Sequence, residues 1–299
     1  MSLGKLLDEY EKQILDERSG GFDYNGLLNQ LNIHEFFRFR PCKEETLDCL
    51  EKDLILFSSP AFFNDGYDTT GFYDLGKIKQ RALEKYPPSW KRDLLITDQN
   101  LVAFFNDPML FRLNSICCFS TELDSMLMWS LYADSHKGFC VKYSFDRVCI
   151  TSLKPSLIDG DYDLQPVCYL MPVVYSKNRL NIQEIADYFA DLQIAASMNG
   201  VFIDRKTNPT LSLRLALVKA TEWSYEHEWR LVVQHRPNIR EVNYPRVAVS
   251  KRPTAVYLGS KISEENKAKI IEICRPKRIK MFQAHLKNTK QYQIEFEEI

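Results

Sequence analysis

Short apolar stretches of strand length are scattered between helical stretches along the whole of this 299-residue chain. They do not follow the steady strand–helix–strand rhythm of a doubly wound parallel sheet. This irregular order predicts an α+β fold, in which one or more mixed, mostly antiparallel sheets are flanked by helices.

Hydrophobic spacing gives the expected positions of these elements. Helices are predicted at residues 3–17, 44–52, most of 75–106 with a break at Pro87 and Pro88, 125–132, 182–198, 211–220 and 263–274. Strands are predicted at residues 36–40, 54–58, 116–119, 139–143, 167–175, 229–233, 255–258, 280–284 and 292–296. No Gly/Ser-rich linker divides the chain. We therefore expect a single domain over residues 31–299, with residues 1–30 as an accessory helix.

Charge and composition restrict the kind of partner. The formal net charge is -1, which argues against a protein built to coat nucleic acid or an anionic membrane. No apolar run approaches the roughly 20 residues that span a bilayer, and the N-terminus lacks the apolar core of a signal peptide. The eight cysteines form no CxxC pair, which favours buried free thiols. We expect a cytoplasmic protein without a membrane partner.

The first two of four polar segments surround the strands predicted at residues 36–40 and 54–58. Alternation places Arg38 and Arg40 on one face of their strand. Two guanidiniums on one face suit phosphate or carboxylate, although pairing with acidic neighbours would account for them equally well. The second segment joins Ser58 to the turn that contains Asn64 and Asp65. Such a turn can shape a ligand pocket or simply reverse the chain.

The third polar segment connects a predicted helix to the next strand. Trp129 and Tyr132 are three residues apart and therefore close on a helix face. Asp134, His136 and Lys137 follow in a polar connection of the kind that often carries function. His136 titrates near neutrality and could carry a proton; a plain surface turn is the alternative.

The fourth polar segment carries two glutamates close together. Alternation puts Glu226, Glu228 and Arg230 on one face of a predicted strand. The two carboxylates would repel each other unless a cation or a ligand lies between them, and Arg38 or Arg40 could supply that charge. A structural Glu–Arg network is the alternative. We expect all four segments to meet in one cleft.

Together the four segments resemble a widespread bacterial family, the domain-of-unknown-function family numbered 2971. That family carries an Arg-rich first strand, an FND-type turn, a WxxYAxxHKGxC-like segment and a YExEWR segment. The corresponding residues here are 37–40, 63–65, 129–140 and 225–230. Gly66 departs from the family, in which proline is commoner at that position. The resemblance extends over about residues 34–260 and implies no established activity.

A second resemblance, to ADP-ribosyltransferases, implies a chemistry. Its basis is the order of a strand with Arg, a helix, a strand ending in Ser-Ser and a late Glu-x-Glu strand. It implies NAD as substrate, with Arg38 or Arg40 on phosphate, Ser58 positioning the ligand, Tyr132 stacking and Glu228 at the nicotinamide ribose. The candidate catalytic residues are Glu226, Glu228 and His136, and the candidate ligand-binding residues are Arg38, Arg40, Ser58, Asn64, Trp129, Tyr132, Lys137 and Arg230.

Two other classes remain open at this stage. A non-catalytic sensor or effector module could bind a nucleotide or a peptide in the same cleft without turnover. A metal-dependent nuclease would place Asp65, Asp134, Glu226 and Glu228 around Mg²⁺. The Glu-x-Lys strand that many nucleases carry is absent, because Trp229 and Arg230 follow Glu228. The sequence identifies no protein or nucleic-acid target.

Overall fold

A large mixed sheet dominates the computed structural model, which describes residues 3–15, 26, 28–101, 113–159, 163–164, 167–197, 211–236 and 244–299. Within these residues the sheet has ten strands in the order β15-β14-β13-β4-β1-β3-β11-β8-β5, with β7 also paired to β11. The strands are β1 (Glu35–Arg40), β3 (Asn114–Ser120), β4 (Phe139–Ser144), β5 (Cys149–Ile150), β7 (Asp163–Leu164), β8 (Tyr169–Pro172), β11 (Glu228–Arg236), β13 (Ala255–Leu258), β14 (Lys280–Leu286) and β15 (Ile294–Glu298). Among the described strands of this sheet, only β13 and β14 pair in parallel. The predicted α+β class, with a mostly antiparallel sheet, is confirmed.

The other strands of the described residues form two smaller sheets. β2 (Leu54–Leu56), β12 (Arg246–Ser250) and β6 (Ser156–Asp159) form one, in which β12 is central. β9 (Val174–Ser176) and β10 (Val218–Ala220) pair in parallel in the other. Two predictions are corrected here. The single strand expected at 167–175 is divided between β8 and β9, and the helix expected at 211–220 stops early and gives way to β10.

The helices follow most of the predicted ranges. They are α1 (Leu3–Leu15), α3 (Glu44–Glu51), α4 (Leu75–Lys85), α5 (Trp90–Leu95), α7 (Met126–Tyr132), α8 (Gln183–Ser197), α9 (Leu211–Leu215) and α10 (Glu264–Cys274), with 3-10 turns η1 (Asn29–Leu31), η2 (Pro60–Phe62) and η4 (Thr221–Glu226). Side chains of Asp74, Ser125 and Ser263 accept backbone N–H groups where α4, α7 and α10 begin, which satisfies donors that lack intrahelical partners. Residues 16–17, 102–106 and 198 of the predicted helices lie outside the described residues.

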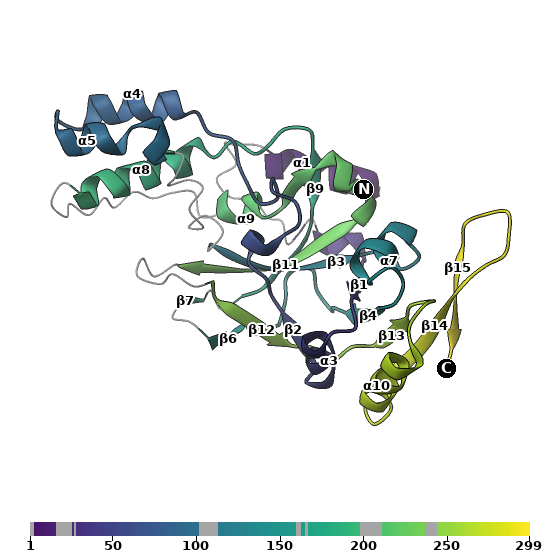
Figure 1. Cartoon of the computed structure of the whole chain (residues 1–299). Helices are drawn as coiled ribbons and strands as arrows, with labels where there is room; N and C mark the ends of the chain where they lie inside the picture. The colour runs from purple at the N-terminus through teal and green to yellow at the C-terminus, as the bar shows by residue number, and fades with distance from the viewer. Residues whose placement is uncertain are drawn as a thin grey trace.

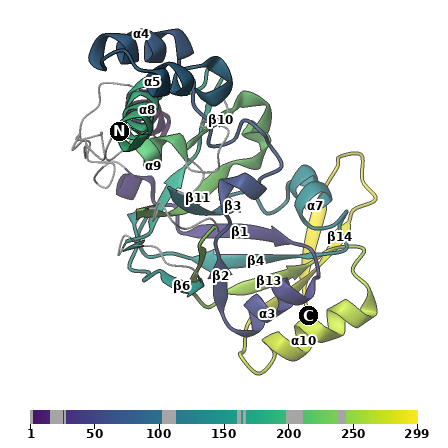
Figure 2. The same ribbon diagram turned by 60° about the vertical axis from the view of Figure 1, so that its left-hand side comes forward.

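Alternate side chains of β1 divide the apolar interior between the two faces of the sheet. Phe37 and Phe39 belong to the cluster under α7, where the Phe39 ring meets Trp129 edge to face at 5.2 Å. Phe36 points into the main core, where its ring lies 5.2 Å from Trp229. Figure 2 shows α7 on one side of β1, β4 and β13, and α3 and α10 on the other. The sheet is therefore covered on both faces near β1.

The N-terminal helix α1 packs back on the rest of the chain. Leu6, Tyr10 and Ile14 form its buried stripe and belong to the main core. The hydroxyl of Tyr10 donates a hydrogen bond to the carbonyl of Pro172 at 2.8 Å. The predicted amphipathic helix is thus confirmed, with its apolar face on its own fold.

Helices α4, α5 and α8 lie together at the end of the molecule away from β13–β15 (Figure 1). Asp191 of α8, whose side chain is fully buried, binds Arg81 at 2.8 Å and Lys85 at 2.7 Å, both from α4. This ionic contact fixes the two longest helices of the group to each other.

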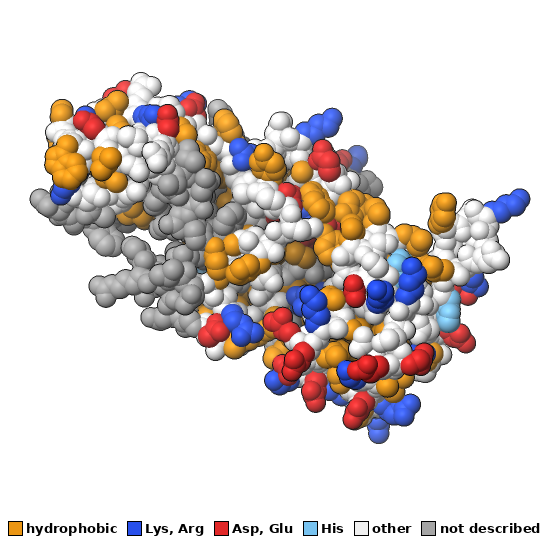
Figure 3. Space-filling view, viewed as in Figure 1, with side chains coloured by type: hydrophobic (Ala, Val, Ile, Leu, Met, Phe, Trp, Pro, Cys, Tyr) orange, Lys and Arg blue, Asp and Glu red, His pale blue; other side chains and the backbone are white. Residues whose placement is uncertain are grey.

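The surface seen in Figure 3 carries no continuous patch of one charge. Acidic and basic side chains are intermixed over α3 and α10, in keeping with the near-zero net charge. None of the helices in the described residues is both long enough and apolar enough to span a bilayer.

Candidate functional site

The site lies where two neighbouring strands of the large sheet separate. β1 and β3 pair only at Phe37 and Ser120. Further along β3, Ile116 pairs instead with Ser58, just after β2. The opening between the strands contains a cavity of about 410 Å³, a volume typical of small-ligand pockets. The separation of these two strands opens the space, and the segment after β2 that carries Asn64 and Asp68 lines one side of it.

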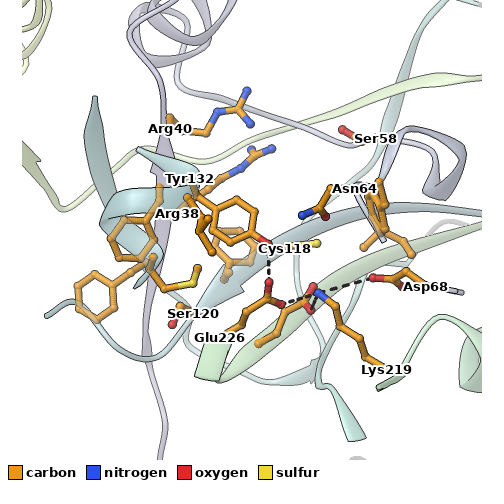
Figure 4. A pocket seen from close by; sticks show the side chains of 18 of the residues that line it. Arg38, Arg40, Ser58, Asn64, Asp68, Cys118, Ser120, Tyr132, Lys219 and Glu226 are labelled. Carbon is orange, nitrogen blue, oxygen red and sulfur yellow. Dashed lines mark hydrogen bonds and ion pairs between the residues drawn. The ribbon is translucent and has the colours of Figure 1, made fainter. Parts of the chain in front are cut away.

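Seven sequence-predicted residues line this cavity, and they come from all four polar segments: Arg38, Arg40, Ser58, Asn64, Tyr132, Glu226 and Glu228 (Figure 4). The expectation that separated segments meet in one cleft agrees with this arrangement. The fold brings them together because β1 and β3 supply the two edges of the opening, while α7 and η4 lie beside them.

Arg38 and Arg40 form one side of the cavity, which we call the arginine wall. Their guanidiniums point the same way, toward the side where Ser58 lies (Figure 4). Arg38 donates a hydrogen bond from Nη2 to the carbonyl of Leu56 at 2.9 Å. Among the described residues, no carboxylate forms an ion pair with either guanidinium. The charge of Arg38, followed by burial, lowers the pKa of Arg40 to about 10. Two adjacent, largely desolvated cations without an anion are costly, so this wall is suited to an anionic ligand.

The opposite side contains a buried set of alternating charges, which we call the ionic cluster: Asp68, Lys219, Glu226, Glu228 and Arg230. The ammonium of Lys219 lies 2.5 Å from Glu226 Oε2 and 3.1 Å from Glu228 Oε2. Arg230 donates to Glu228 Oε1 from Nε at 2.8 Å. The cation between the two glutamates is therefore Lys219, and the expectation that Arg38 or Arg40 fills this place is wrong.

The two glutamates differ in their surroundings. Burial would raise the pKa of Glu228, but Arg230 and Lys219 outweigh that effect and hold it at about 2. Burial and the charge of Glu228 raise the pKa of Glu226, against the opposing effects of Lys219 and Tyr132. Tyr132 donates its hydroxyl hydrogen to Glu226 Oε1 at 2.5 Å. Glu228 is thus a fixed anion of the fold, whereas Glu226 is the less stabilised carboxylate at the cavity.

Apolar side chains complete the lining and extend to the surface. Phe62 and Leu131 both line the cavity, yet are 71% and 58% exposed. The ring of Phe62 meets Tyr244 edge to face at 5.2 Å. The cavity therefore opens to solvent past a flat, partly aromatic rim, which could contact the apolar face of a ring.

Comparison with known proteins gives one match. Residues 128–231 match the family model described as "Protein of unknown function (DUF2971)". This match supports the family resemblance found in the sequence. No curated protein and no solved structure matches the chain, so the likeness to ADP-ribosyltransferases receives no support from these comparisons.

The DUF2971 match covers part of the site. It runs from α7 into β11 and contains Tyr132, Lys219, Glu226 and Glu228. The arginine wall and the Ser58–Asn64 side of the cavity lie outside it. The matched segment therefore carries Lys219, Glu226, Glu228 and Arg230 of the ionic cluster, and the preceding part of the chain carries Asp68 and the arginine wall.

Four predicted site residues of the DUF2971 match lie outside the lining: Trp129, His136, Lys137 and Arg230. Trp129 is fully buried, and its indole N–H donates to the carbonyl of Leu123 at 2.8 Å. His136 stacks on that indole, with ring centroids 6.2 Å apart, and burial lowers its pKa. Lys137 is exposed. The prediction that these side chains contact a ligand in the cleft is corrected: none of them lines the cavity, and His136 packs on the buried Trp129 of α7.

Arg230, the fourth such residue, is fully buried outside the lining. Its guanidinium also donates to both carboxylate oxygens of Asp68, at 2.8 and 2.6 Å. The guanidinium is saturated by the fold, so Arg230 corresponds to the structural Glu–Arg alternative rather than to a ligand contact.

The ionisable lining residues Asp68, Cys118 and Lys219 were not among the predicted site residues, although Lys219 begins the fourth polar segment. Asp68 sits in a polar turn that carries no local signal of burial. Cys118 follows Cys117 in an apolar strand, and burial raises the pKa of its thiol well above the usual value, so the thiol stays protonated. Lys219 lies in an apolar run of helical spacing. The role of Asp68 depends on Arg230, 162 positions away, whereas Lys219 binds Glu226 and Glu228, seven and nine positions further along the chain.

The predicted nuclease ligands do not converge on one point. Glu226 and Glu228 are bound by Lys219, and Asp134 is not part of the lining. Within the described ranges, no group of three or more His, Cys, Asp or Glu side chains is placed to hold a metal ion. The arrangement suits an anionic organic ligand better than a divalent cation.

Proposed function

We propose that the cavity binds a nucleotide-type ligand through its phosphate groups, and that this ligand is NAD or a related ADP-ribosyl compound. The observation that carries the proposal is the arginine wall. Two guanidiniums face the cavity, and within the described residues no carboxylate pairs with either. Arg binds phosphate oxygens with several hydrogen bonds in fixed geometry. A pyrophosphate would supply the missing negative charge.

The remaining lining suits the other parts of such a ligand. Asn64, Tyr132 and Glu226 present polar atoms to the side opposite the arginine wall. These groups fit the hydroxyls of a ribose, because amide, phenol and carboxylate oxygens all form hydrogen bonds with hydroxyls. The exposed ring of Phe62 offers a flat surface to a base. One side of the cavity therefore suits the phosphates of the ligand, and the opposite side suits its sugar.

The proposed reaction is cleavage of the bond between nicotinamide and ribose, with transfer to water or to another acceptor. The electron pair of the bond leaves with the nicotinamide nitrogen, and an oxygen of the acceptor bonds to the ribose carbon. The sugar passes through an oxocarbenium-like state, which a nearby carboxylate stabilises. The sequence assigned this role to Glu228. Glu228 is already bound by Arg230 and Lys219, so we assign it to Glu226.

Thermal unfolding with a panel of ligands tests the binding step. A ligand that binds only the folded state raises the melting temperature. NAD and ADP-ribose should raise it, and Mg²⁺ alone should not. Arg40→Met should weaken ADP-ribose binding by about 10- to 150-fold, the loss expected for a hydrogen bond to a charged group. Arg246→Met on β12 is the matched control, since Arg246 is 56% exposed, and its affinity should match the wild type.

Nicotinamide release from NAD tests the chemical step. If the wild type releases nicotinamide and Glu226→Gln does not, the result supports the proposed enzymatic cleavage of NAD. Binding of ADP-ribose without release supports the sensor or effector alternative. A melting temperature unchanged by every phosphate compound in the panel would refute the proposal, and a rise with Mg²⁺ alone would favour the nuclease.

A further inference from the structure

The ionic cluster contains one more carboxylate than it has cations. Asp68, Glu226 and Glu228 face Lys219 and Arg230, and all five side chains belong to residues no more than 6% exposed. If every group were ionised, the cluster would carry one uncompensated negative charge out of water. Such a charge is costly, and buried groups commonly avoid it by changing their protonation. The charge count therefore calls for one additional proton within the cluster.

The contacts indicate where that proton resides. Asp68 receives two hydrogen bonds from Arg230, and Glu228 receives bonds from both Arg230 and Lys219. Glu226 shares Lys219 with Glu228, and its other partner is the neutral hydroxyl of Tyr132. Glu226 is the carboxylate that the cations compensate least, and it lines the cavity.

We propose that Glu226 is the acid–base residue of this cavity, the group that binds and releases a proton beside the ligand, and that Tyr132 positions it. The role toward a phosphate-bearing ligand rests on the proposed function. The titration of Glu226 itself does not, because it follows from the contacts of the protein alone. In the reaction proposed above, the ionised carboxylate accepts the proton that the attacking water loses as its oxygen bonds to the ribose carbon. Glu226 then carries that proton as a carboxylic acid until it passes to solvent.

The tyrosines and the lysine packed against Glu226 keep one charge state from pH 4 to pH 9. The elements packed against η4 are α7, β9 and β10, and they contribute Tyr132, Tyr175 and Lys219. Burial raises the pKa of both tyrosines above the ordinary phenol value. Burial would lower the pKa of Lys219, but Glu228 and the other carboxylates outweigh it and raise the pKa. Burial also raises the pKa of Tyr225, on η4 itself. These phenols stay neutral and the ammonium stays charged, which leaves Glu226 to titrate.

Protonation of Glu226 changes the charge that an anionic ligand meets. Below the pKa of Glu226 the ionic cluster is neutral, and the arginine wall makes the net charge around the cavity positive. Above it, one negative charge is added opposite that wall. Repulsion between this charge and an anionic ligand lowers the affinity of the cavity for the ligand. The affinity for a pyrophosphate compound should therefore fall as pH rises through this pKa.

The first experiment needs no ligand. The side-chain carboxyl carbons of ¹³C-labelled glutamate are followed by NMR from pH 4 to pH 9 in the wild type and in Glu226→Gln. One resonance should titrate at a higher pH than the other glutamates and be missing from the variant. If Glu226 titrates with the other glutamates, the inference is wrong, whatever the cavity binds.

The second experiment measures ADP-ribose affinity by calorimetry from pH 5.5 to pH 9. ADP-ribose is the probe because its pyrophosphate diester does not titrate in this range. The wild-type affinity should fall with pH, and Glu226→Gln should remove the dependence, since Gln resembles the neutral acid. Tyr132→Phe should move the midpoint to higher pH, because the phenol hydrogen bond lowers the pKa of Glu226. Glu222→Gln is the matched control, an exposed glutamate of the same 3-10 turn, and should keep the wild-type profile.

The outcomes separate this inference from the proposed function. A wild-type pH profile in Glu226→Gln, or an unmoved midpoint in Tyr132→Phe, contradicts the assigned roles. If ADP-ribose binds at no pH, the proposed function fails, while the NMR titration still decides whether Glu226 holds the proton. Circular dichroism checks folding, and if Glu226→Gln does not fold, Tyr132→Phe supplies the shifted titration.

Discussion

Arg230 donates hydrogen bonds to both carboxylate oxygens of Asp68, at 2.8 and 2.6 Å, although 162 positions separate them in the chain. Both side chains are buried. Asp68 follows the turn that carries Phe63 and Asn64, and Arg230 lies on β11 in the large sheet. The contact therefore fixes one side of the cavity to the sheet.

Asp68→Asn tests how much this contact contributes to the stability of the fold. The change keeps the shape of the side chain but leaves the buried guanidinium of Arg230 without half of its negative partners. Loss of one partner of a buried ion pair typically lowers the free energy of unfolding by roughly 3–5 kcal/mol. Urea denaturation at pH 7 measures it. Asp48→Asn is the control, because Asp48 pairs with Lys52 at the surface, where such pairs contribute about 0–1 kcal/mol. Equal losses in the two variants would contradict a structural role for the Asp68 contact.

No sequence pattern indicates the contact between Asp68 and Arg230, for a physical reason. Local patterns report burial through hydrophobic periodicity, and an Asp in a polar turn reads as solvent-exposed. The charge that makes burial of Asp68 tolerable is supplied by Arg230 from a distant strand. Prediction from one segment at a time therefore finds the arginine-bearing strand and the Glu-x-Glu segment, and misses the residue that joins two of the segments.

Errors at Lys219 and Glu226 have a related origin. The run that precedes Lys219 has helical apolar spacing, but pairing with β9 makes residues 218–220 a strand. Glu226 and Glu228 were expected to share a strand face. Instead Glu226 ends η4, and His227 adopts a left-handed conformation with φ 44°, which lets both carboxylates reach Lys219. Tertiary pairing overrides local propensity at both positions, whereas β1, α7 and β4 follow local patterns closely.

Glu228 should make the fold sensitive to acid. Its pKa is about 2 in the fold against an ordinary value of 4.5, so its ionised form stabilises the fold at neutral pH. That contribution is lost as the pH falls from about 4.5 toward 2. Glu228→Gln should therefore lower the free energy of unfolding by roughly 3–5 kcal/mol at pH 7, and by much less near pH 2–3. Urea denaturation at both pH values measures it. A difference from the wild type that is the same at both would exclude this account.

The chain should behave as one domain that includes α1. β1, β3, β11 and β13 come from positions between 35 and 258 and interleave in one sheet, so no cut divides them into two complete sheets. After limited proteolysis, the fragments should remain associated through gel filtration and unfold in one transition. Two fragments that separate and keep independent folded spectra would disprove the single domain.

Gly138 should be required for the close approach of two backbone segments: the end of β1, which carries the arginine wall, and the turn after α7. It joins the turn after α7 to β4, and a Cβ placed there would lie 2.2 Å from the carbonyl oxygen of Arg40 and 3.0 Å from that of Ala133. These are backbone atoms, so no rotamer change relieves the clash. Gly138→Ala must move the end of β1 or the turn, and overpacking of this kind costs typically 1–3 kcal/mol or more.

Gly66→Ala is the matched control, because a Cβ at Gly66 meets nothing within 4 Å. Urea denaturation should show a clear loss of stability for Gly138→Ala and little change for Gly66→Ala. The displaced end of β1 carries Arg40, so Gly138→Ala should also weaken pyrophosphate binding in excess of its effect on folding. Calorimetry with ADP-ribose, under conditions where both variants are fully folded, measures this second effect. Unchanged stability in Gly138→Ala would mean that the end of β1 and the turn can separate without cost, and the wall would then not depend on that contact.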